Sequence, residues 1–440
     1  MNILFIHQNF PGQYMHIAPY MQRLGHDVTG LGETKNIQNR GVIKTINTVG
    51  YPTPEGAGER THHYLQTMEA AVRRGQSVAR SLLSMQQKGY KPDVISLHPG
   101  WGEGLFVRDI YPDTPILMFC EYYFRALNAD LGFDPEFPQN PDWNFSVRLR
   151  NTQQIVSLMT ANACLSPTRW QASRYPDFIR PRIRVTHDGV NTEYMCPDQE
   201  DSLTLQPLEQ AGESRVVGHP PVGEQDTSPP KGTPITLRPS DKVITFIARN
   251  LEPYRGFHKL MRALPEVQRL HPDAHVLIVG SDGVSYSPKL PDDKSYKELY
   301  LDEVKDGIDL SRIHFLGRVP YSALRALYRI SSAHVYLTYP FVLSWSPLEA
   351  MSCESLLVAS DTEPVREVMT HGKNALLVDF FDTDALVATL DEALTSPEKF
   401  EHIRKNARKT IQTKFELHRC LKKQAELLQD VATGKYPAPW

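Results

Sequence analysis

Short apolar runs alternate with longer amphipathic segments along the first part of the chain, and this alternation constrains the fold more than any other feature. The apolar runs predict buried strands, and the segments between them have helical spacing. Strands that are apolar on both faces and alternate with helices form parallel sheets covered on both sides, so we predict a doubly wound α/β domain. The expected strands are ILFIH (3–7), DVTGL (27–31), DVISLH (93–98), PILMFC (115–120) and ACLSP (163–167).

The alternation stops at residues 197–240 and then restarts. This stretch is rich in Pro, Gly, Ser and acidic residues and has weak periodicity, which is typical of an extended or partly disordered insertion. A chain of 440 residues exceeds what one core usually organises, so we predict two Rossmann-like domains facing each other across a cleft, with ligands at the carboxyl ends of the strands. The later strands are expected at KVITFIAR (242–249), HVLIVGSDG (275–283), IHFLGRV (313–319), HVYLTYP (334–340), LLVASD (356–361) and ALLVDF (375–380).

Composition excludes several classes of protein. Hydrophobic residues make up 40% of the chain and charged residues 22%, and the net charge of −3 gives no strong overall field for nucleic acid. No run approaches the ~20 apolar residues of a membrane span, and the N-terminus lacks a signal peptide. The five cysteines are scattered without metal-ligand spacing. We expect a cytoplasmic protein with no bound metal; peripheral membrane contact and the oligomeric state stay open.

Glu349 lies in the stretch PFVLSWSPLEAMSCE (340–354), where two interpretations compete. Ser346-Pro347-Leu348-Glu349 matches the S-x-x-E capping box, in which the glutamate bonds back to the cap amide. The expected helix, from about residue 347, follows a strand, so its N-terminus lies at the carboxyl edge of the sheet and forms an anion site. A phosphate beside the amides of Ser344, Trp345 and Ser346 would leave Glu349 one turn inside, able to accept hydrogen bonds from sugar hydroxyls.

Two arginines lie at the same expected edge. Arg249 closes the first strand of the second half, and Arg255 follows a Pro-containing turn just before a helix. Arginine offers fixed donors that match phosphate oxygens, whereas loop arginines are often merely solvated. Two arginines and a helix N-terminus on one sheet edge favour a diphosphate site.

The first half offers weaker candidates. Gly12, in the loop HQNFPGQY after the first strand, lets the backbone approach a ligand, although the loop is not a G-x-G-x-x-G fingerprint. His98 and Glu121 end two later strands, where each could meet a sugar hydroxyl, or His98 could act as acid or base. A histidine merely satisfied at the sheet edge is the alternative for His98. Asp382-Thr383-Asp384 opens an expected helix, so helix capping explains it better than a metal.

The chain resembles the GT-B-fold retaining glycosyltransferases of family 4, which transfer a sugar from a nucleotide diphosphate sugar. The similarity is clearest in the second half and covers most of the chain outside 197–240. It implies an acceptor domain at 1–190, completed by a C-terminal helix at 418–440, and a donor domain at 191–417. The motifs that carry it are ARNLEPYRGFHKL, LIVGSDG, IHFLGRVPYSALRALYRISSAHVYLTYPFVLSWSPLEAMSCE, EPVREVMTHGKNALLVD, LSPTRWQASRYP and HDGVNTEYMCPD.

The resemblance also implies roles for single residues. Arg249, Arg255 and the amides of Ser344, Trp345 and Ser346 would hold the diphosphate without a metal or other cofactor. Glu349 would bind the ribose. Gly317 and Val319 would border the nucleobase, and the Gly12 loop would face the phosphates.

The sequence departs from this family in three places, the first of which is Phe341. The family commonly has E-x7-E, and the position eight residues before Glu349 is Phe341, where a glutamate usually approaches the donor sugar. Arg255 takes the place of the usual phosphate lysine, one residue further from Arg249 than expected, and Cys120 and Glu121 occupy a strand end where the family often has a histidine. We expect a retaining hexosyltransferase that uses a UDP-sugar and a hydroxyl acceptor in glycan, glycolipid or glycoside biosynthesis. The alternatives are a nucleotide-sugar epimerase of the same fold and a non-catalytic nucleotide-sugar-binding protein.

Overall fold

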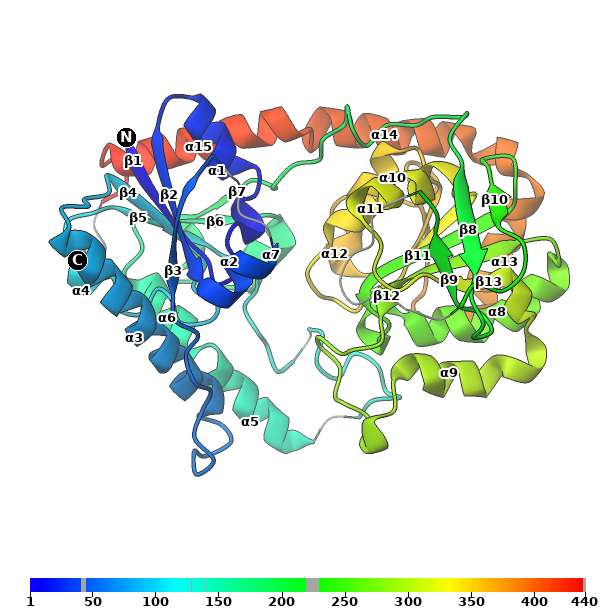
Figure 1. Ribbon diagram of the computed structural model, residues 1–440, viewed down its shortest axis with the longest axis horizontal. Helices are drawn as coiled ribbons and strands as arrows, with labels where there is room; N and C mark the ends of the chain where they lie inside the picture. The colour runs from blue at the N-terminus through cyan, green and yellow to red at the C-terminus, as the bar shows by residue number, and fades with distance from the viewer. Residues whose placement is uncertain (41–44, 128, 139, 219–228, 438–440) are drawn as a thin grey trace. The chain divides into compact units, whose positions relative to one another are not determined.

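The computed structural model describes residues 1–40, 45–127, 129–138, 140–218 and 229–437 (Figure 1). The chain divides into two compact units: unit 1 comprises Met1–Gly189 and Leu417–Trp440, and unit 2 comprises Val190–Glu416. Among the described residues, every helix is too short or too polar to serve as a membrane span.

Unit 1 contains a seven-stranded parallel sheet with the order β3-β2-β1-β4-β5-β6-β7. The four strands β1, β4, β5 and β6 are almost fully buried, as their apolar runs predict. The strands are β1 (Asn2–Ile6), β2 (Asp27–Glu33), β3 (Asn47–Tyr51), β4 (Val94–Leu97), β5 (Ile116–Phe119), β6 (Ala163–Ser166) and β7 (Ile183–Val185).

Helices cover both faces of this sheet, and each face has its own apolar core between the sheet and the helices. On one face, α1 and α15 pack against Ile3, Phe5 and Phe119. On the other face, α3, α4 and α6 pack against Leu4, Ile6 and Met118. The helices of unit 1 are α1 (Ile17–Arg23), α2 (Thr34–Arg40), α3 (Gln66–Gln87), α4 (Val107–Ile110), α5 (Pro141–Arg150), α6 (Thr152–Met159), α7 (Arg169–Arg174) and α15 (Leu417–Ala432).

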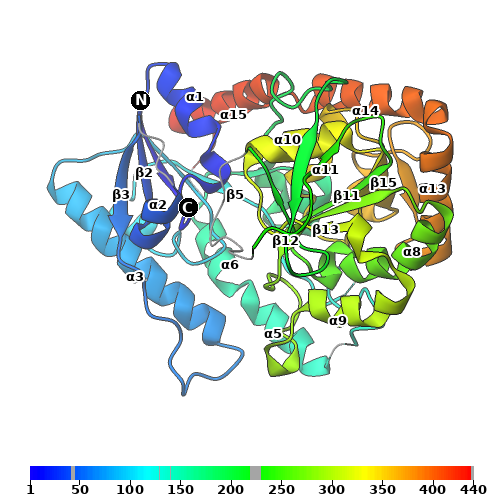
Figure 2. The ribbon, with the colours of Figure 1, turned by 45° about the vertical axis from the view of Figure 1, so that its right-hand side comes forward.

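Unit 2 contains a six-stranded parallel sheet with the order β13-β12-β11-β14-β15-β16. Figures 1 and 2 show α8 and α13 on one side of it and α10 and α11 on the other. The prediction of two doubly wound Rossmann-like domains is confirmed. The strands are β11 (Val243–Asn250), β12 (His275–Ser281), β13 (Ile313–Phe315), β14 (Ala333–Tyr336), β15 (Leu357–Ser360) and β16 (Leu376–Val378); the helices are α8 (Phe257–Leu270), α9 (Tyr296–Val304), α10 (Tyr321–Ile330), α11 (Trp345–Ser352), α12 (Glu363–Arg366), α13 (Thr383–Thr395) and α14 (Glu401–Lys414).

The stretch 197–240 is more ordered than its composition predicts. It forms a three-stranded antiparallel sheet, β10-β8-β9, from Leu203–Pro207 (β8), Ser214–Val216 (β9) and Ile235–Leu237 (β10). Leu203, Leu205 and Leu237 are buried in a core shared with β11 and α10, which explains the order. The expectation was an extended or partly disordered insertion: β8, β9 and β10 are extended but ordered, while residues 219–228 lie outside the described part of the chain.

Candidate functional site

In both parallel sheets the strand order reverses beside the first strand of the unit. This switch point determines where the candidate residues lie close together. In unit 1, β1 lies between β2 and β4; in unit 2, β11 lies between β12 and β14. Open α/β sheets bind ligands at the carboxyl ends of the strands at such switch points. The residues that follow β1, β4, β11 and β14 are therefore the first to consider.

In unit 2, Arg249 lies near the carboxyl end of β11, beside the switch point. Its side chain is exposed, and no hydrogen bond or ion pair joins its guanidinium to another described residue. An arginine with all its donors facing solvent at this edge can neutralise an anionic ligand without first breaking an internal bond.

Arg255 differs because the protein holds it in place. Gly256, with φ of +68°, ends the turn Pro253–Arg255 and opens α8; a Cβ there would lie 2.2 Å from Leu337 Cβ. Arg255 is thereby directed at the residues after β14. Its Nη1 lies within hydrogen-bonding distance of Tyr336 Oη (3.1 Å), Thr338 Oγ1 (2.9 Å) and the Val342 carbonyl oxygen (3.1 Å).

The N-terminus of α11 meets Arg255 at the hydroxyl group of Tyr336. The helix begins at Trp345 with Ser344 as the N-cap, and the Ser344 amide donates to Tyr336 Oη at 3.1 Å. Ser344 Oγ and Ser346 Oγ are 2.9 Å apart. The Ser344 amide is therefore already used inside unit 2, and the N-terminus of α11 contributes the positive end of its helix dipole at this edge.

Glu349 is not a capping-box residue. Because the N-cap is Ser344 rather than Ser346, Glu349 lies a turn inside α11, and its Oε1 accepts a hydrogen bond from Tyr321 Oη at 2.7 Å. Burial raises the pKa of Glu349 above its usual range, and the Tyr321 hydrogen bond offsets part of that rise. The capping interpretation is wrong, and the carboxylate is held by α10 instead.

Gly317 and Val319 follow β13, two strands from the switch point. Gly317 has φ of +56°, and its carbonyl oxygen accepts from the amide of Gly280 at 3.0 Å, which joins the ends of β12 and β13. Val319 is half-buried against the core of the small antiparallel sheet. Both residues thus lie at the carboxyl edge.

In unit 1, Gly12 closes a tight loop over the end of β1. Its φ is +46°, and a Cβ built on it would lie 2.6 Å from Cε1 of His7. Only glycine fits both the left-handed backbone and the imidazole beneath it. The loop therefore packs on His7, a residue that the sequence reasoning missed although it ends a strand just as His98 does.

His98 and Glu121 are brought together from adjacent strands β4 and β5. Nε2 of His98 is 3.2 Å from Oε2 of Glu121, and Gln13 Nε2 donates to Oε1 at 2.9 Å. Burial tends to raise the pKa of Glu121, but the hydrogen bonds from His98 and Gln13 and the electrostatic effects of His98 and His7 together outweigh it, so the pKa of this carboxyl is lowered overall. Gln13 is a second residue that the sequence reasoning missed.

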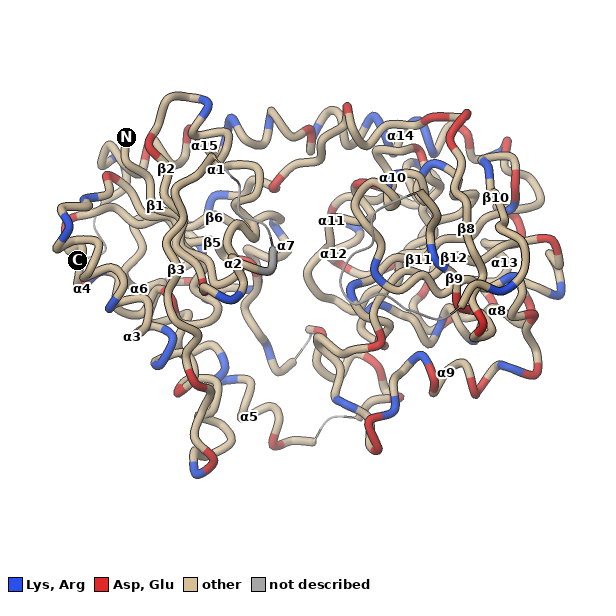
Figure 3. Tube along the Cα trace, in the orientation of Figure 1, with Lys and Arg blue, Asp and Glu red and all other residues tan. Residues whose placement is uncertain are grey.

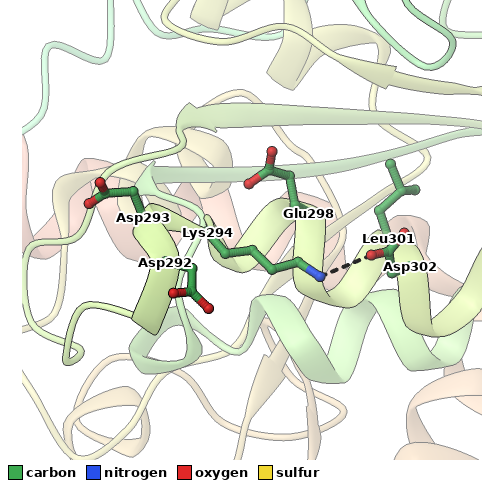
Figure 4. A pocket seen from close by; sticks show the side chains of 6 residues that line it. All are labelled: Asp292, Asp293, Lys294, Glu298, Leu301 and Asp302. Carbon is green, nitrogen blue, oxygen red and sulfur yellow. Dashed lines mark hydrogen bonds and ion pairs between the residues drawn. The ribbon is translucent and has the colours of Figure 1, made fainter.

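Among the described residues, the charges do not gather in a single patch outside this region. Basic and acidic residues are interspersed along both units (Figure 3). A hollow of about 500 Å³ is lined by Leu301, by the carboxylates Asp292, Asp293, Glu298 and Asp302, and by Lys294, which pairs with Asp302 at 2.9 Å (Figure 4). None of the predicted site residues lines it.

Comparisons with known proteins agree with the arrangement of the two sheets. A family model described as glycosyl transferase family 4 group matches residues 24–195, and one described as glycosyl transferases group 1 matches residues 233–410. The chain belongs to the GT-B glycosyltransferases of family 4.

This family 4 member is similar to curated relatives over limited stretches. A phosphatidyl-myo-inositol mannosyltransferase from Mycolicibacterium smegmatis is 29% identical over 156 residues, which cover 34% of this chain and 35% of the relative. YtcC from Bacillus subtilis is 25% identical over 208 residues, which cover 46% of this chain and 49% of the relative. The chain thus spans between a third and a half of the length of these relatives.

Solved structures match over nearly the whole of this family 4 chain. Sucrose-phosphate synthase from Thermosynechococcus elongatus has a TM-score of 0.71 at 14% identity, covering 99% of this chain and 100% of that one. HepE from Anabaena, solved with UDP-glucose, has a TM-score of 0.63 at 16% identity, covering 98% and 100%. At these identities the likeness shows the GT-B fold alone.

Phe341 marks where this family 4 member departs from the family pattern. Instead of a carboxylate, the position holds a buried ring whose centroid is 4.6 Å from that of Tyr286 and 5.6 Å from that of Tyr254. The Arg255 guanidinium carbon lies 5.7 Å from the centre of the same ring. Phe341 therefore packs against the Arg255 guanidinium, whereas a glutamate at this position would compete with a ligand anion for the charge of Arg255.

Proposed function

We propose that the protein is a retaining glycosyltransferase that moves a hexose from a UDP-sugar to a hydroxyl group of an acceptor in glycan, glycolipid or glycoside biosynthesis. Unit 2 binds the donor and unit 1 binds the acceptor. The observation that carries the proposal is the pair of arginines at the carboxyl edge of unit 2. Arg255 is fixed by Tyr336, Thr338 and Val342, and Arg249 has its guanidinium in solvent.

This edge suits a nucleotide diphosphate. Two guanidinium groups offer charge and donors to phosphate oxygens, and the N-terminus of α11 adds the positive end of its dipole. Glu349 offers an acceptor for ribose hydroxyls. The UDP-glucose in HepE, a protein of the same fold, favours uridine as the base. The proposal needs neither a metal nor another cofactor, because the arginines neutralise the departing diphosphate.

The proposed reaction exchanges one bond at the anomeric carbon for another on the same face. The bond to the diphosphate oxygen breaks, the acceptor oxygen bonds to that carbon, and the acceptor proton passes to the leaving phosphate. Electrostatic stabilisation of the developing negative charge by Arg249 and Arg255 lowers the barrier. A cytoplasmic location stays a prediction that rests on the scattered cysteines.

The replacement of the family glutamate by Phe341 favours a second candidate, a protein that binds a nucleotide sugar without transferring it. A donor panel of UDP-, GDP- and ADP-sugars, with and without acceptors, separates the two. Transfer or slow donor hydrolysis supports the enzyme, and saturable binding without turnover supports the sensor.

The direct test is Arg249→Ala, with UDP affinity measured by calorimetry. Loss of one charge-assisted contact is expected to weaken binding about 10- to 100-fold. Arg269→Ala is the matched control, since Arg269 is an exposed arginine bonded to Glu266 at the C-terminal end of α8, away from this edge. Unchanged UDP affinity in Arg249→Ala would contradict the phosphate assignment.

A further inference from the structure

The carboxyl ends of β1, β4 and β5 in unit 1 assemble one compact group of side chains. His7 follows β1, His98 follows β4 and Glu121 follows β5, while Gln13 reaches in from the loop after β1. β1 and β4 flank the switch point of this sheet. The group therefore occupies the position where a doubly wound sheet presents ligand contacts.

Hydrogen bonds from backbone amides determine which ring nitrogen of each histidine carries the proton. The amide of Gly100 donates to Nδ1 of His98 at 3.1 Å, and the amide of Asn9 donates to Nδ1 of His7 at 2.9 Å. Because Nδ1 accepts in each ring, the proton of the neutral imidazole lies on Nε2. His98 therefore donates from Nε2 to Glu121 and orients the carboxylate without neutralising it.

Glu121 retains acceptor capacity after these contacts. Its side chain is 32% exposed, and its carboxylate receives one donor on each oxygen, from Gln13 and from His98. An ionised carboxylate has about four lone-pair positions and no donor. Ligand groups that meet it must therefore donate hydrogen bonds, as sugar hydroxyls do.

Trp101 supplies an apolar surface next to this carboxylate. Its ring stacks on His98, with centroids 4.3 Å apart and planes at 23°, and its edge meets His7 at 5.2 Å. The indole is half-buried and held by both histidines. A rigid aromatic ring beside a polar acceptor matches a sugar, which has an apolar face and a hydroxyl edge.

The charges around the group disfavour an anionic ligand. Among the described residues, no lysine or arginine pairs with Glu121. Arg74, in the adjacent network, is already bonded to Glu33 at 2.6 Å. Glu103, in the same network through Tyr51, is fully buried. A phosphate placed here would meet the Glu121 carboxylate without a matching cation.

We propose that unit 1 binds its acceptor as an uncharged sugar ring, whose hydroxyls donate to Glu121 and whose apolar face lies on Trp101. This assignment rests on the proposed function, because it names the acceptor class of the same enzyme. It excludes phosphorylated sugars as the preferred acceptor.

The test measures binding to the full chain by calorimetry in the presence of UDP. The probes are the methyl α-glycosides of glucose, galactose and mannose, with glucose 6-phosphate as the anionic counterpart. We expect at least one neutral glycoside to bind more tightly than the phosphate. Glu121→Gln should weaken that binding at least tenfold, because one carboxylate oxygen becomes a donor, and Glu59→Gln, an exposed glutamate of the same unit, should not change it.

A second variant, Trp101→Leu, keeps the proposal testable if Glu121→Gln does not fold. Trp101→Leu removes the stacking surface and should also weaken the neutral glycoside while UDP still binds. The proposal is overturned if no neutral glycoside binds, if binding is equal in the variants, or if glucose 6-phosphate binds more tightly. UDP titration alone reports on the proposed function, so absence of UDP binding identifies a failure of that function rather than of the acceptor assignment.

Discussion

Ser214 Oγ lies 3.0 Å from Nδ1 of His314, and this contact joins the small antiparallel sheet to the main sheet of unit 2. His314 Nε2 is 2.9 Å from His275 Nδ1, and His275 Nε2 is 2.6 Å from Arg312 Nη1. Arginine can only donate, so each histidine must accept on Nε2 and donate from Nδ1. The protons along this chain therefore all point from Arg312 toward Ser214.

This arrangement predicts a loss of stability in acid. Burial, and then the nearby His275 and Arg312 charges, lower the pKa of His314 to about 4. With an unfolded value near 6.5, the unfolded state binds more protons between these values, so the free energy of unfolding falls as pH drops from about 6.5 toward 4, by about 2 kcal/mol at pH 5 from this group alone. Urea unfolding of wild type and His314→Gln at pH 7 and pH 5 measures the difference.

His314→Gln should be less stable than wild type at pH 7 but should lose less stability on acidification. His402→Gln is the control, because His402 is an exposed histidine of the same unit. An identical pH dependence in wild type and His314→Gln would show that His314 does not contribute to acid sensitivity.

Tyr321→Phe should impair both stability and nucleotide binding. Tyr321 Oη is the hydrogen-bond donor to the buried carboxylate of Glu349, and loss of a partner for a buried acceptor costs about 1–3 kcal/mol. Urea unfolding and UDP calorimetry measure the two effects. Tyr20→Phe is the control, since the Tyr20 hydroxyl makes no hydrogen bond to another described residue. Unchanged UDP affinity in Tyr321→Phe would argue against the ribose assignment of Glu349.

Arg255→Lys should weaken UDP binding even though the charge is retained. The guanidinium is held through Nη1 by three oxygens, and a lysine ammonium cannot both keep this anchorage and present a planar pair of donors. We expect affinity between those of wild type and Arg255→Ala, with Arg255→Ala lower by about 10- to 100-fold. Equal affinities for wild type and Arg255→Lys would mean that charge alone is recognised.

Gly12→Ala should destabilise unit 1 more than Gly25→Ala does. Both glycines have positive φ, +46° and +84°, so both substitutions incur the left-handed backbone cost of about 1–2 kcal/mol. Only at Gly12 would the new Cβ meet a side chain, His7, whereas nothing lies within 4 Å at Gly25. Thermal unfolding should show an additional loss of about 1–3 kcal/mol at Gly12. Equal losses would show that His7 moves aside freely.

The buried strands of both sheets could be predicted because each is an apolar run that is visible in the sequence without knowledge of the neighbouring strands. The edge strands β3 and β7 could not: Asn47–Tyr51 and Ile183–Val185 each contain one buried residue among exposed or half-buried ones, and neither carries an apolar run. The small antiparallel sheet was missed for a related reason, since a few leucines set its burial within a Pro- and Gly-rich stretch.

The site was predictable at the level of strand ends but not of pairings. Arg249, Arg255, His98 and Glu121 were recognised because each lies near the carboxyl end of an expected strand. The contacts of Arg255 with Tyr336 and of Glu349 with Tyr321 span 81 and 28 residues, and no local pattern encodes such distances. The S-x-x-E pattern also does not reveal that the N-cap is Ser344 rather than Ser346.

The helix α15 has a consequence for the order in which the protein is made. Leu421, Ala425 and Leu428 of this helix fill the same core as Ile3 and Phe5 of the first strand. During synthesis α1 can cover part of that face early, but the part that α15 covers stays exposed until the ribosome has delivered residue 417 and beyond, after all of unit 2. Of the two units, the one that leaves the ribosome earlier is therefore completed later, and its exposed apolar surface is where chaperones are expected to bind the nascent chain.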